Sequence, residues 1–317
     1  MSAAVVSTPL VDLLNGMSYG LLLFMLSAGL TLIFSFLGVL NVAHASFYML
    51  GAYVGTAIGA QWNFWIAIVA APAVVGAAGA LVERLLLRRV RAQGSLHELL
   101  LTFGLAYCLG EAVKLIWGPG TLAAPVPAIL DAPFIVLDGA TFSRYRAFVM
   151  ATALLMLGLL YAVLHLSRTG LVLRAALDAR QAVEALGHDV PRIGTLVFAL
   201  GTGLAALAGV VGAPLFVVEP GMAESMGSIV FVVAIVGGLG SVGGALAASL
   251  AIGCLQTFAA ASPWRLGALA DAAGLALPPR WGALTLTQLA PLVPYLLLVA
   301  MLVWRPRGIA GTRGDAP

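Results

Sequence analysis

The sequence predicts an all-α, polytopic integral membrane helix bundle. Of its 317 residues, 62% are hydrophobic and 9% are charged, whereas a soluble domain carries ~25% charged residues. The 16 basic and 13 acidic side chains cannot cover the surface of a soluble protein of 32.5 kDa. No charged residue lies between Asp12 and Glu83, a stretch that can hold two or three spanning helices of about 20 residues each. Most of the chain is therefore expected to face lipid or other apolar helices.

The apolar segments run continuously, which favours helices over strands. A β-barrel would alternate apolar and polar residues, and an open sheet edge would leave backbone groups unpaired in hydrocarbon. We expect a single domain over residues 1–317 with about eight to nine spanning or re-entrant segments. The apolar segments cover residues 14–37, 42–60, 62–82, 96–116, 146–166, 193–214, 228–238, 244–262 and 284–304.

Two of these segments are too short or too interrupted to be ordinary spans. Segment 228–238 ends in the glycine-rich turn 237–244, and segment 42–60 follows the polar break 41–46. Each leads into a row of small residues at four-residue spacing, which lets helix backbones approach closely. Paired interruptions in two halves indicate an internal repeat with a pathway between the repeats, although bundle packing alone can explain either row. The rows are Gly51, Gly55 and Gly59, and Gly240, Gly244 and Ala248.

The arginines predict the orientation of the bundle. When the polar segments are assigned alternately to two sides, eleven of the 16 basic residues fall on one side, in segments 84–91, 168–192 and 305–313. The positive-inside rule makes this side cytoplasmic. The C-terminus is then inside, and the N-terminus and segment 118–145 are outside.

Polar residues within the apolar segments are candidates for a pathway. Asn41, His44 and Ser46 flank a broken helix, where freed backbone groups need partners or line a cavity, and we favour a lining role for them. Glu111 and Lys114 are three residues apart near the outer end of their segment. This spacing favours an ion pair over a proton relay.

Residues 167–192 are expected to form a short amphipathic helix on the cytoplasmic side. Apolar residues recur there at intervals of four and three, Arg180 can pair with Glu184, and Gly187 suits the position after the helix end. Docking in the groove of a partner and resting on the lipid headgroups both explain such a stripe. The stripe consists of Val172, Ala176, Ala179, Val183 and Leu186.

The sequence carries little that indicates catalysis. Residues 238–243 match G-x-G-x-x-G, but the acidic residue expected ~20 positions later in a dinucleotide site is missing, the next acid being Asp271. No phosphate loop exists, because Lys114 is the only lysine and follows Val113. Ser241 could serve an intramembrane hydrolase, but no base for it is evident. We therefore expect no catalytic group, cofactor or metal site, and the net charge of +3 is too small to suggest nucleic acid.

Several segments together carry a family resemblance. Residues 29–34, 38–44 and 47–53 read GLTLIF, GVLNVAH and FYMLGAY, and further matches are EALG at 184–187, GGLGSVGG at 237–244 and RPRGI at 305–309. They resemble the shorter of the two permease subunits of branched-chain amino acid ABC transporters. The resemblance spans nearly the whole chain, although Ala45 stands where the family pattern usually has Gly.

The resemblance implies a transport subunit in the bacterial inner membrane. Its partners would be a second permease subunit, two cytoplasmic ATPase subunits and a soluble substrate-binding protein. Members of the family carry leucine, isoleucine and valine, and close relatives carry urea, short amides or aromatic acids. An ion-gradient-driven secondary transporter is the alternative, favoured if Glu111 titrates during transport. The expected ATPase-coupling residues are Glu184, Ala185, Leu186 and Gly187, and the expected translocation-path residues are Asn41, His44, Ser46, Gly240 and Ser241.

Overall fold

Apolar helices form the body of the molecule, as the sequence predicts. A computed structural model describes residues 4–137, 140–262, 264–272, 274 and 278–311. Seven helical segments in this part are long and apolar enough to cross a membrane, and the shorter α2 and α10, of 18 and 16 residues, are not among the seven. The main helices are α1 (Ala4–Leu37), α2 (His44–Gln61), α3 (Phe64–Val82), α5 (Ser95–Trp117), α6 (Arg144–Leu166), α9 (Val190–Gly212), α10 (Met222–Gly237), α11 (Val242–Ala261) and α15 (Val293–Trp304).

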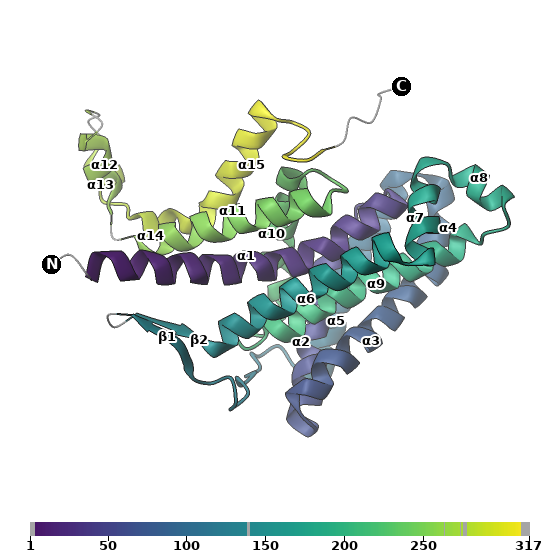
Figure 1. The fold of residues 1–317 in the computed structure, drawn as a ribbon, viewed down its shortest axis with the longest axis horizontal. Helices are drawn as coiled ribbons and strands as arrows, with labels where there is room; N and C mark the ends of the chain where they lie inside the picture. The colour runs from purple at the N-terminus through teal and green to yellow at the C-terminus, as the bar shows by residue number, and fades with distance from the viewer. Residues whose placement is uncertain (1–3, 138–139, 263, 273, 275–277, 312–317) are drawn as a thin grey trace.

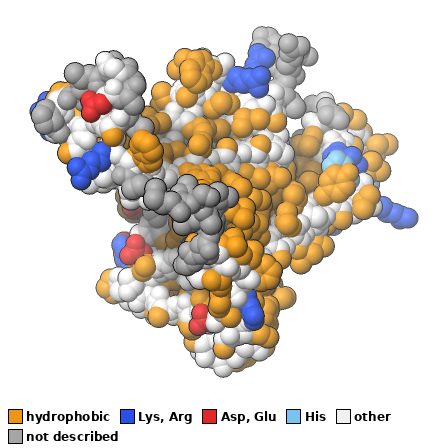
Figure 2. All heavy atoms as spheres, turned by 60° about the vertical axis from the view of Figure 1, so that its left-hand side comes forward, with side chains coloured by type: hydrophobic (Ala, Val, Ile, Leu, Met, Phe, Trp, Pro, Cys, Tyr) orange, Lys and Arg blue, Asp and Glu red, His pale blue; other side chains and the backbone are white. Residues whose placement is uncertain are grey.

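α1 lies at the centre of the bundle and is the most deeply buried of the seven candidate spans. It packs against α9 and α6 on one side and against α11 and α10 on the other (Figure 1). By contrast, α5 and α15 are the least buried of the seven. Their outward faces carry apolar side chains, and hydrophobic residues cover much of the face seen in Figure 2. Such faces suit contact with lipid or with another membrane subunit.

Small residues let the central helices approach backbone to backbone. A methyl group on Gly55 of α2 would lie 2.6 Å from Val210 Cγ2 of α9, and Gly51 is in tighter contact with Ala206. The first predicted row therefore packs α2 on α9, except that Gly59 has space around it. Sequence reasoning missed a second pair of helices joined in this way. A methyl group on Gly253 of α11 would lie 2.5 Å from Gly20 Cα of α1.

The second predicted row is wrong in part. Gly244 and Ala248 are buried on α11, but Gly240 lies in the turn before this helix, with φ +88°. A row of helix-packing residues requires one continuous helix. Gly240 therefore belongs to the turn and not to the row.

The described chain departs from simple spans at several further places. A π-helical turn (Glu83–Leu87), α4 (Arg88–Val90) and the 3-10 turn η2 (Arg91–Gln93) continue α3 up to Gly94. An antiparallel hairpin of β1 (Pro133–Leu137) and β2 (Ala140–Ser143) precedes α6. The predicted segment 284–304 is divided into α14 (Leu286–Leu289), η3 (Ala290–Leu292) and α15, because Pro291 and Pro294 cannot donate backbone hydrogen bonds. Two short helices, α12 (Leu266–Ala272) and α13 (Pro279–Gly282), lie between α11 and α14.

The bundle has two distinct ends. Leu37 of α1 and Glu83 beside α3 both approach Gly194 of α9, and Ser35 approaches Gly240, so these chain segments meet at one end. The segments 84–91, 168–192 and 305–309 lie there, and we call it the arginine-rich end (right in Figure 1). Arg313 falls outside the described residues. The opposite end, called the hairpin end, carries β1, β2 and the start of α1.

Candidate functional site

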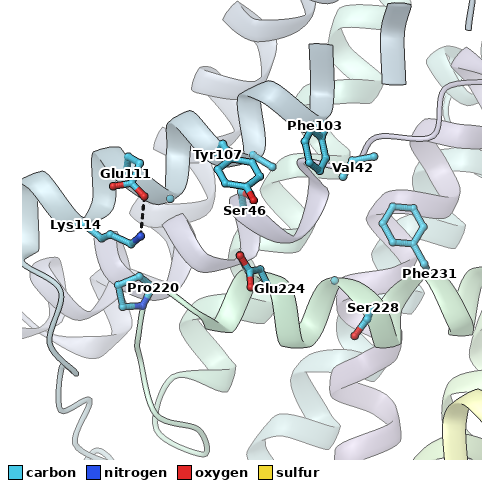
Figure 3. Close-up of a pocket in the computed structure, with 14 residues that line it drawn as sticks. Val42, Ser46, Phe103, Tyr107, Glu111, Lys114, Pro220, Glu224, Ser228 and Phe231 are labelled. Atoms are coloured by element: carbon cyan, nitrogen blue, oxygen red, sulfur yellow. Dashed lines mark hydrogen bonds and ion pairs between the residues drawn. The ribbon is translucent and has the colours of Figure 1, made fainter. Parts of the chain in front are cut away.

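A cavity of about 460 Å³ opens between α2, α5 and α10 (Figure 3). Its inner part is apolar and aromatic, whereas charged side chains surround its part nearest the hairpin end. Helix α5 contributes most of one wall and α10 contributes the other. The lining residues are Val42, Ser46, Phe103, Ala106, Tyr107, Gly110, Glu111, Lys114, Pro220, Ala223, Glu224, Gly227, Ser228 and Phe231.

Three charged side chains of the cavity come from two helices. Lys114 Nζ donates to Glu111 Oε1 at 2.7 Å, which confirms the ion pair expected from their spacing. Glu224 stands on α10 and adds to the negative potential at Lys114. Its carboxylate points from α10 toward Ser46 (Figure 3). Among the described residues it forms no hydrogen bond or ion pair. The cavity therefore holds one compensated pair and one free carboxylate.

Ser46 is the one predicted pathway residue on the wall of this cavity. It lies in the first turn of α2, is 2% exposed, and its hydroxyl forms no hydrogen bond with a described residue. The N-cap residue of this helix is Ala43, whose methyl side chain cannot accept a hydrogen bond from the first turn. The positive end of the α2 dipole and a free hydroxyl therefore face the same space.

Asn41 and His44 are buried in the packing beside the cavity and are not among its lining residues. Asn41 Oδ1 accepts from Ala43 N at 3.1 Å, and its backbone oxygen accepts from His44 N. His44 Nε2 lies 3.0 Å from Leu26 O, and since a carbonyl only accepts, this ring nitrogen carries the proton. The His44 side chain thus fixes the start of α2 against the middle of α1, whereas the Asn41 side chain stabilises only the turn before α2. Their role in a pathway stays a prediction.

Gly240 and Ser241 lie away from the cavity, in the turn between α10 and α11. Ser241 Oγ accepts from Gly244 N at 3.1 Å and so caps α11. Gly240 O accepts from Ser35 Oγ at 2.8 Å. Ile309 N and Ala310 N donate to the last carbonyls of α10, so two of the segments that carry the family resemblance contact each other. Gly311 lies against Gly238 and Ser35 against Gly240, so the first two glycines of the G-x-G-x-x-G match pack against other parts of the chain.

Segment 167–192 forms two helices where one was expected. α7 (Arg168–Asp178) and α8 (Arg180–Ala185) are separated at Ala179, whose φ of −145° and ψ of 71° are not helical. The predicted stripe is therefore correct only for Ala176 and Val183, which are buried, and in part for Val172, which is half-buried. Ala179 is exposed and Leu186 is 79% exposed. The side chain of Arg180, expected to pair with Glu184, lies outside the described part of the chain.

Gly187 ends α8 in the conformation expected from the sequence. Its φ is +87°, in the left-handed region that favours glycine. Gly187 N donates to Glu184 O at 3.0 Å and His188 N donates to Val183 O at 3.3 Å. These two bonds are those of a Schellman motif, which turns the chain sharply away from the helix. Glu184, Ala185 and Leu186 consequently lie at an exposed tip of the arginine-rich end.

Polar contacts centred on the buried Glu83 carboxylate attach this tip to the spanning helices. Arg88 beside α3 donates to Pro191 O at 2.8 Å and to Glu83 Oε2 at 3.2 Å. Thr195 of α9 also donates to Glu83 Oε2, at 2.7 Å, and the Glu83 side chain is 1% exposed. Sequence reasoning did not identify this network, because Glu83 and Thr195 are far apart in the chain. It joins the end of α3 to the start of α9, directly after the α7–α8 segment.

The chain is similar to known transport proteins over most of its length. Residues 13–302 match the family model described as branched-chain amino acid transport system / permease component. The chain is similar to the high-affinity branched-chain amino acid transport system permease protein BraD of Pseudomonas aeruginosa and to LivH of Escherichia coli, each 26% identical over 95% of both chains. It is also 27% identical to a probable LivH protein of Methanocaldococcus jannaschii, over 92% of this chain and 90% of that protein. No solved structure gives a significant match. The family match covers most of the chain, and the chain belongs to the branched-chain amino acid transport permease family.

Proposed function

We propose that this chain is the membrane permease subunit of an ATP-driven importer of branched-chain amino acids or related small polar solutes. The observation that carries the proposal is the family match over residues 13–302, which includes all the main helices except part of α1 and the end of α15. The names of the relatives supply the solute class. In this function the chain provides a pathway and has no catalytic group of its own.

The proposed assembly contains a second permease subunit, two cytoplasmic ATPase subunits and a soluble substrate-binding protein. The arginine-rich end faces the cytoplasm in this assembly, because basic residues are retained there during insertion. The exposed tip at Glu184, Ala185, Leu186 and Gly187 then lies where a cytoplasmic ATPase can reach it. An apolar side chain such as Leu186 is suited to a groove on that partner.

The attachments of α7 and α8 suggest how ATPase closure could reach the membrane. At the α7 side, Ser167 Oγ caps the helix by accepting from Gly170 N, and Arg174 Nη1 lies 3.2 Å from His165 Nδ1 of α6. At the α8 side, the Arg88 network joins the following chain to α3 and α9. A displacement of the tip would therefore tilt α3, α6 and α9 together. Such rigid-body movement can open a pathway alternately to either side.

Reconstitution tests this proposal. The chain is purified together with its proposed ATPase, second-permease and binding-protein partners, placed in proteoliposomes, and assayed for uptake of radiolabelled L-leucine. We expect uptake that needs both ATP and the binding protein, and that stops when the ATPases cannot hydrolyse ATP. Uptake that follows an ion gradient and ignores ATP would contradict the proposal and support secondary transport.

A further inference from the structure

Polar groups on the cavity between α2, α5 and α10 must face something other than hydrocarbon. Glu111, Lys114 and Glu224 are all exposed, and they lie in the turns of α5 and α10 nearest the hairpin end. A charged side chain in contact with hydrocarbon is costly, so such groups face a partner, a water-filled cavity, a solute or the headgroup region. All three line one cavity, whose volume of about 460 Å³ is within the usual range for small-molecule sites.

Two polar groups of the cavity without a hydrogen bond to a described residue, those of Glu224 and Ser46, differ in electrostatic character. Glu224 presents a carboxylate with no hydrogen bond to a described residue, because the cation of Lys114 is already held by Glu111. Ser46 presents an unbonded hydroxyl at the positive end of the α2 dipole. One position therefore favours a cationic group, and the other favours an anionic group.

These two positions are close to each other. A Cβ atom on Gly227 of α10 would lie 3.1 Å from Ala45 Cβ of α2, so the helices touch beside Ser46. Glu224 is one helical turn before Gly227, on the same side of α10. Figure 3 shows the Glu224 carboxylate directed toward Ser46 across this gap. A small molecule with an ammonium and a carboxylate group on the same carbon atom can therefore reach Glu224 and Ser46 at once.

The inner part of the cavity suits an apolar group. Val42, Phe103 and Phe231 line it beyond Ser46 and carry no polar side-chain atoms. A molecule held by its charged end between Glu224 and Ser46 would direct an aliphatic side chain toward these residues. Burial there would favour leucine-sized groups over hydrogen-bonding ones.

We propose that this cavity is a binding site for the zwitterionic head of an α-amino acid with an aliphatic side chain. The ammonium group is held by Glu224, the carboxylate by the Ser46 hydroxyl, and the side chain by Phe103 and Phe231. The inference rests on the proposed function for the class of solute. It excludes simple anions as good ligands, because they would approach the uncompensated carboxylate of Glu224.

Protection from cysteine labelling tests the site. Gly110→Cys is introduced together with Cys108→Ser and Cys254→Ser, since Gly110 lines the cavity and has open space for a side chain. The assembled complex is labelled with a small maleimide, without the binding protein, in the presence of L-leucine. We expect L-leucine to slow labelling several-fold, L-leucinamide to slow it less, and 4-methylpentanoate, which lacks the ammonium group, to leave it unchanged.

Two variants and a matched control assign the roles. Glu224→Gln should raise the L-leucine concentration needed for protection by roughly tenfold or more, because a charge-assisted hydrogen bond is lost. Ser46→Ala should remove the difference between L-leucine and L-leucinamide. Glu219→Gln makes the same chemical change outside the lining residues and should leave protection intact.

The outcomes separate this inference from the proposed function, because ATP-driven uptake is measured independently. Equal protection in the Glu224→Gln and Glu219→Gln proteins, equal protection by 4-methylpentanoate, or a cysteine at position 110 that does not label would each overturn the site. If ATP-driven uptake is normal in that case, the importer function stands without the site. If protection behaves as expected but uptake does not require ATP, the site stands and the proposed function fails.

Discussion

The exposed tip at Leu186 yields a quantitative prediction for ATPase binding. Leu186 is 79% exposed, so most of its side chain is free to be buried by a partner. Leu186→Ala removes three carbon atoms, and at ~0.8 kcal/mol per buried carbon this loses roughly 2 kcal/mol of binding energy. Since 1.4 kcal/mol corresponds to a tenfold change in affinity, we expect ATPase binding to weaken about 30-fold. Folding should be unaffected, because the side chain contributes little to the core.

The measurement is a titration of the fluorescent ATPase onto the paired permeases in nanodiscs. Leu115→Ala is the matched control, because Leu115 is 87% exposed but lies near the hairpin end of α5. This control removes the same atoms from an equally exposed position and should leave the affinity unchanged. Equal ATPase affinities for the two variants would refute the coupling role of the tip. A helix that only rests on the lipid headgroups would then be the better interpretation of the segment.

Three further changes test the packing and the attachments. Gly55→Leu should destabilise the bundle by about 1–3 kcal/mol or more, because the new side chain has no space against α9. The control Gly158→Leu, on the open face of α6, should not destabilise it. Thermal unfolding in detergent compares the two variants. Gly187→Val should destabilise the turn after α8 by about 1–2 kcal/mol, because a β-branched residue is strained at φ +87°. The variant should insert in the membrane normally but take up less solute per ATP hydrolysed. An unchanged ratio of uptake to hydrolysis would count against a role of this turn in coupling. Thr195→Val should lower the free energy of unfolding by about 1–3 kcal/mol, because it removes a hydrogen-bond donor from the buried Glu83 carboxylate. The control Arg192→Gln changes a side chain that is 86% exposed and should lower it by less than about 1 kcal/mol. Similar melting temperatures for the two variants would contradict this ranking.

Most of the fold could be predicted from the hydropathy of the sequence and from the positions of its glycines. Continuous apolar segments predict helices because the bilayer leaves backbone groups no other partner, and this holds for every main helix here. The left-handed conformation of Gly187 follows from its position after an amphipathic stretch and before Pro191. These features are local in the sequence and could be read without knowing what packs against them.

The features that were missed depend on contacts between distant segments. Glu224 fell outside the predicted segment 228–238, whereas α10 begins at Met222 and includes it. Ala179 interrupts segment 167–192 although alanine is the best helix former, and it is exposed whereas Ala176 and Val183 are buried. Helix propensity cannot show such a break, which depends on where neighbouring helices lie.

The central position of α1 has a consequence for how the protein is made. Its packing partners α9 and α11 follow it by more than 150 residues, so α1 must remain in the bilayer long before they are synthesised. During that interval Gly16 and Gly20, which later contact α11, are surrounded by lipid. The helix must therefore be apolar on every side to insert, even though only other helices surround most of it afterwards. A charged residue at buried Ser27 would consequently fail at membrane insertion, before any packing is tested.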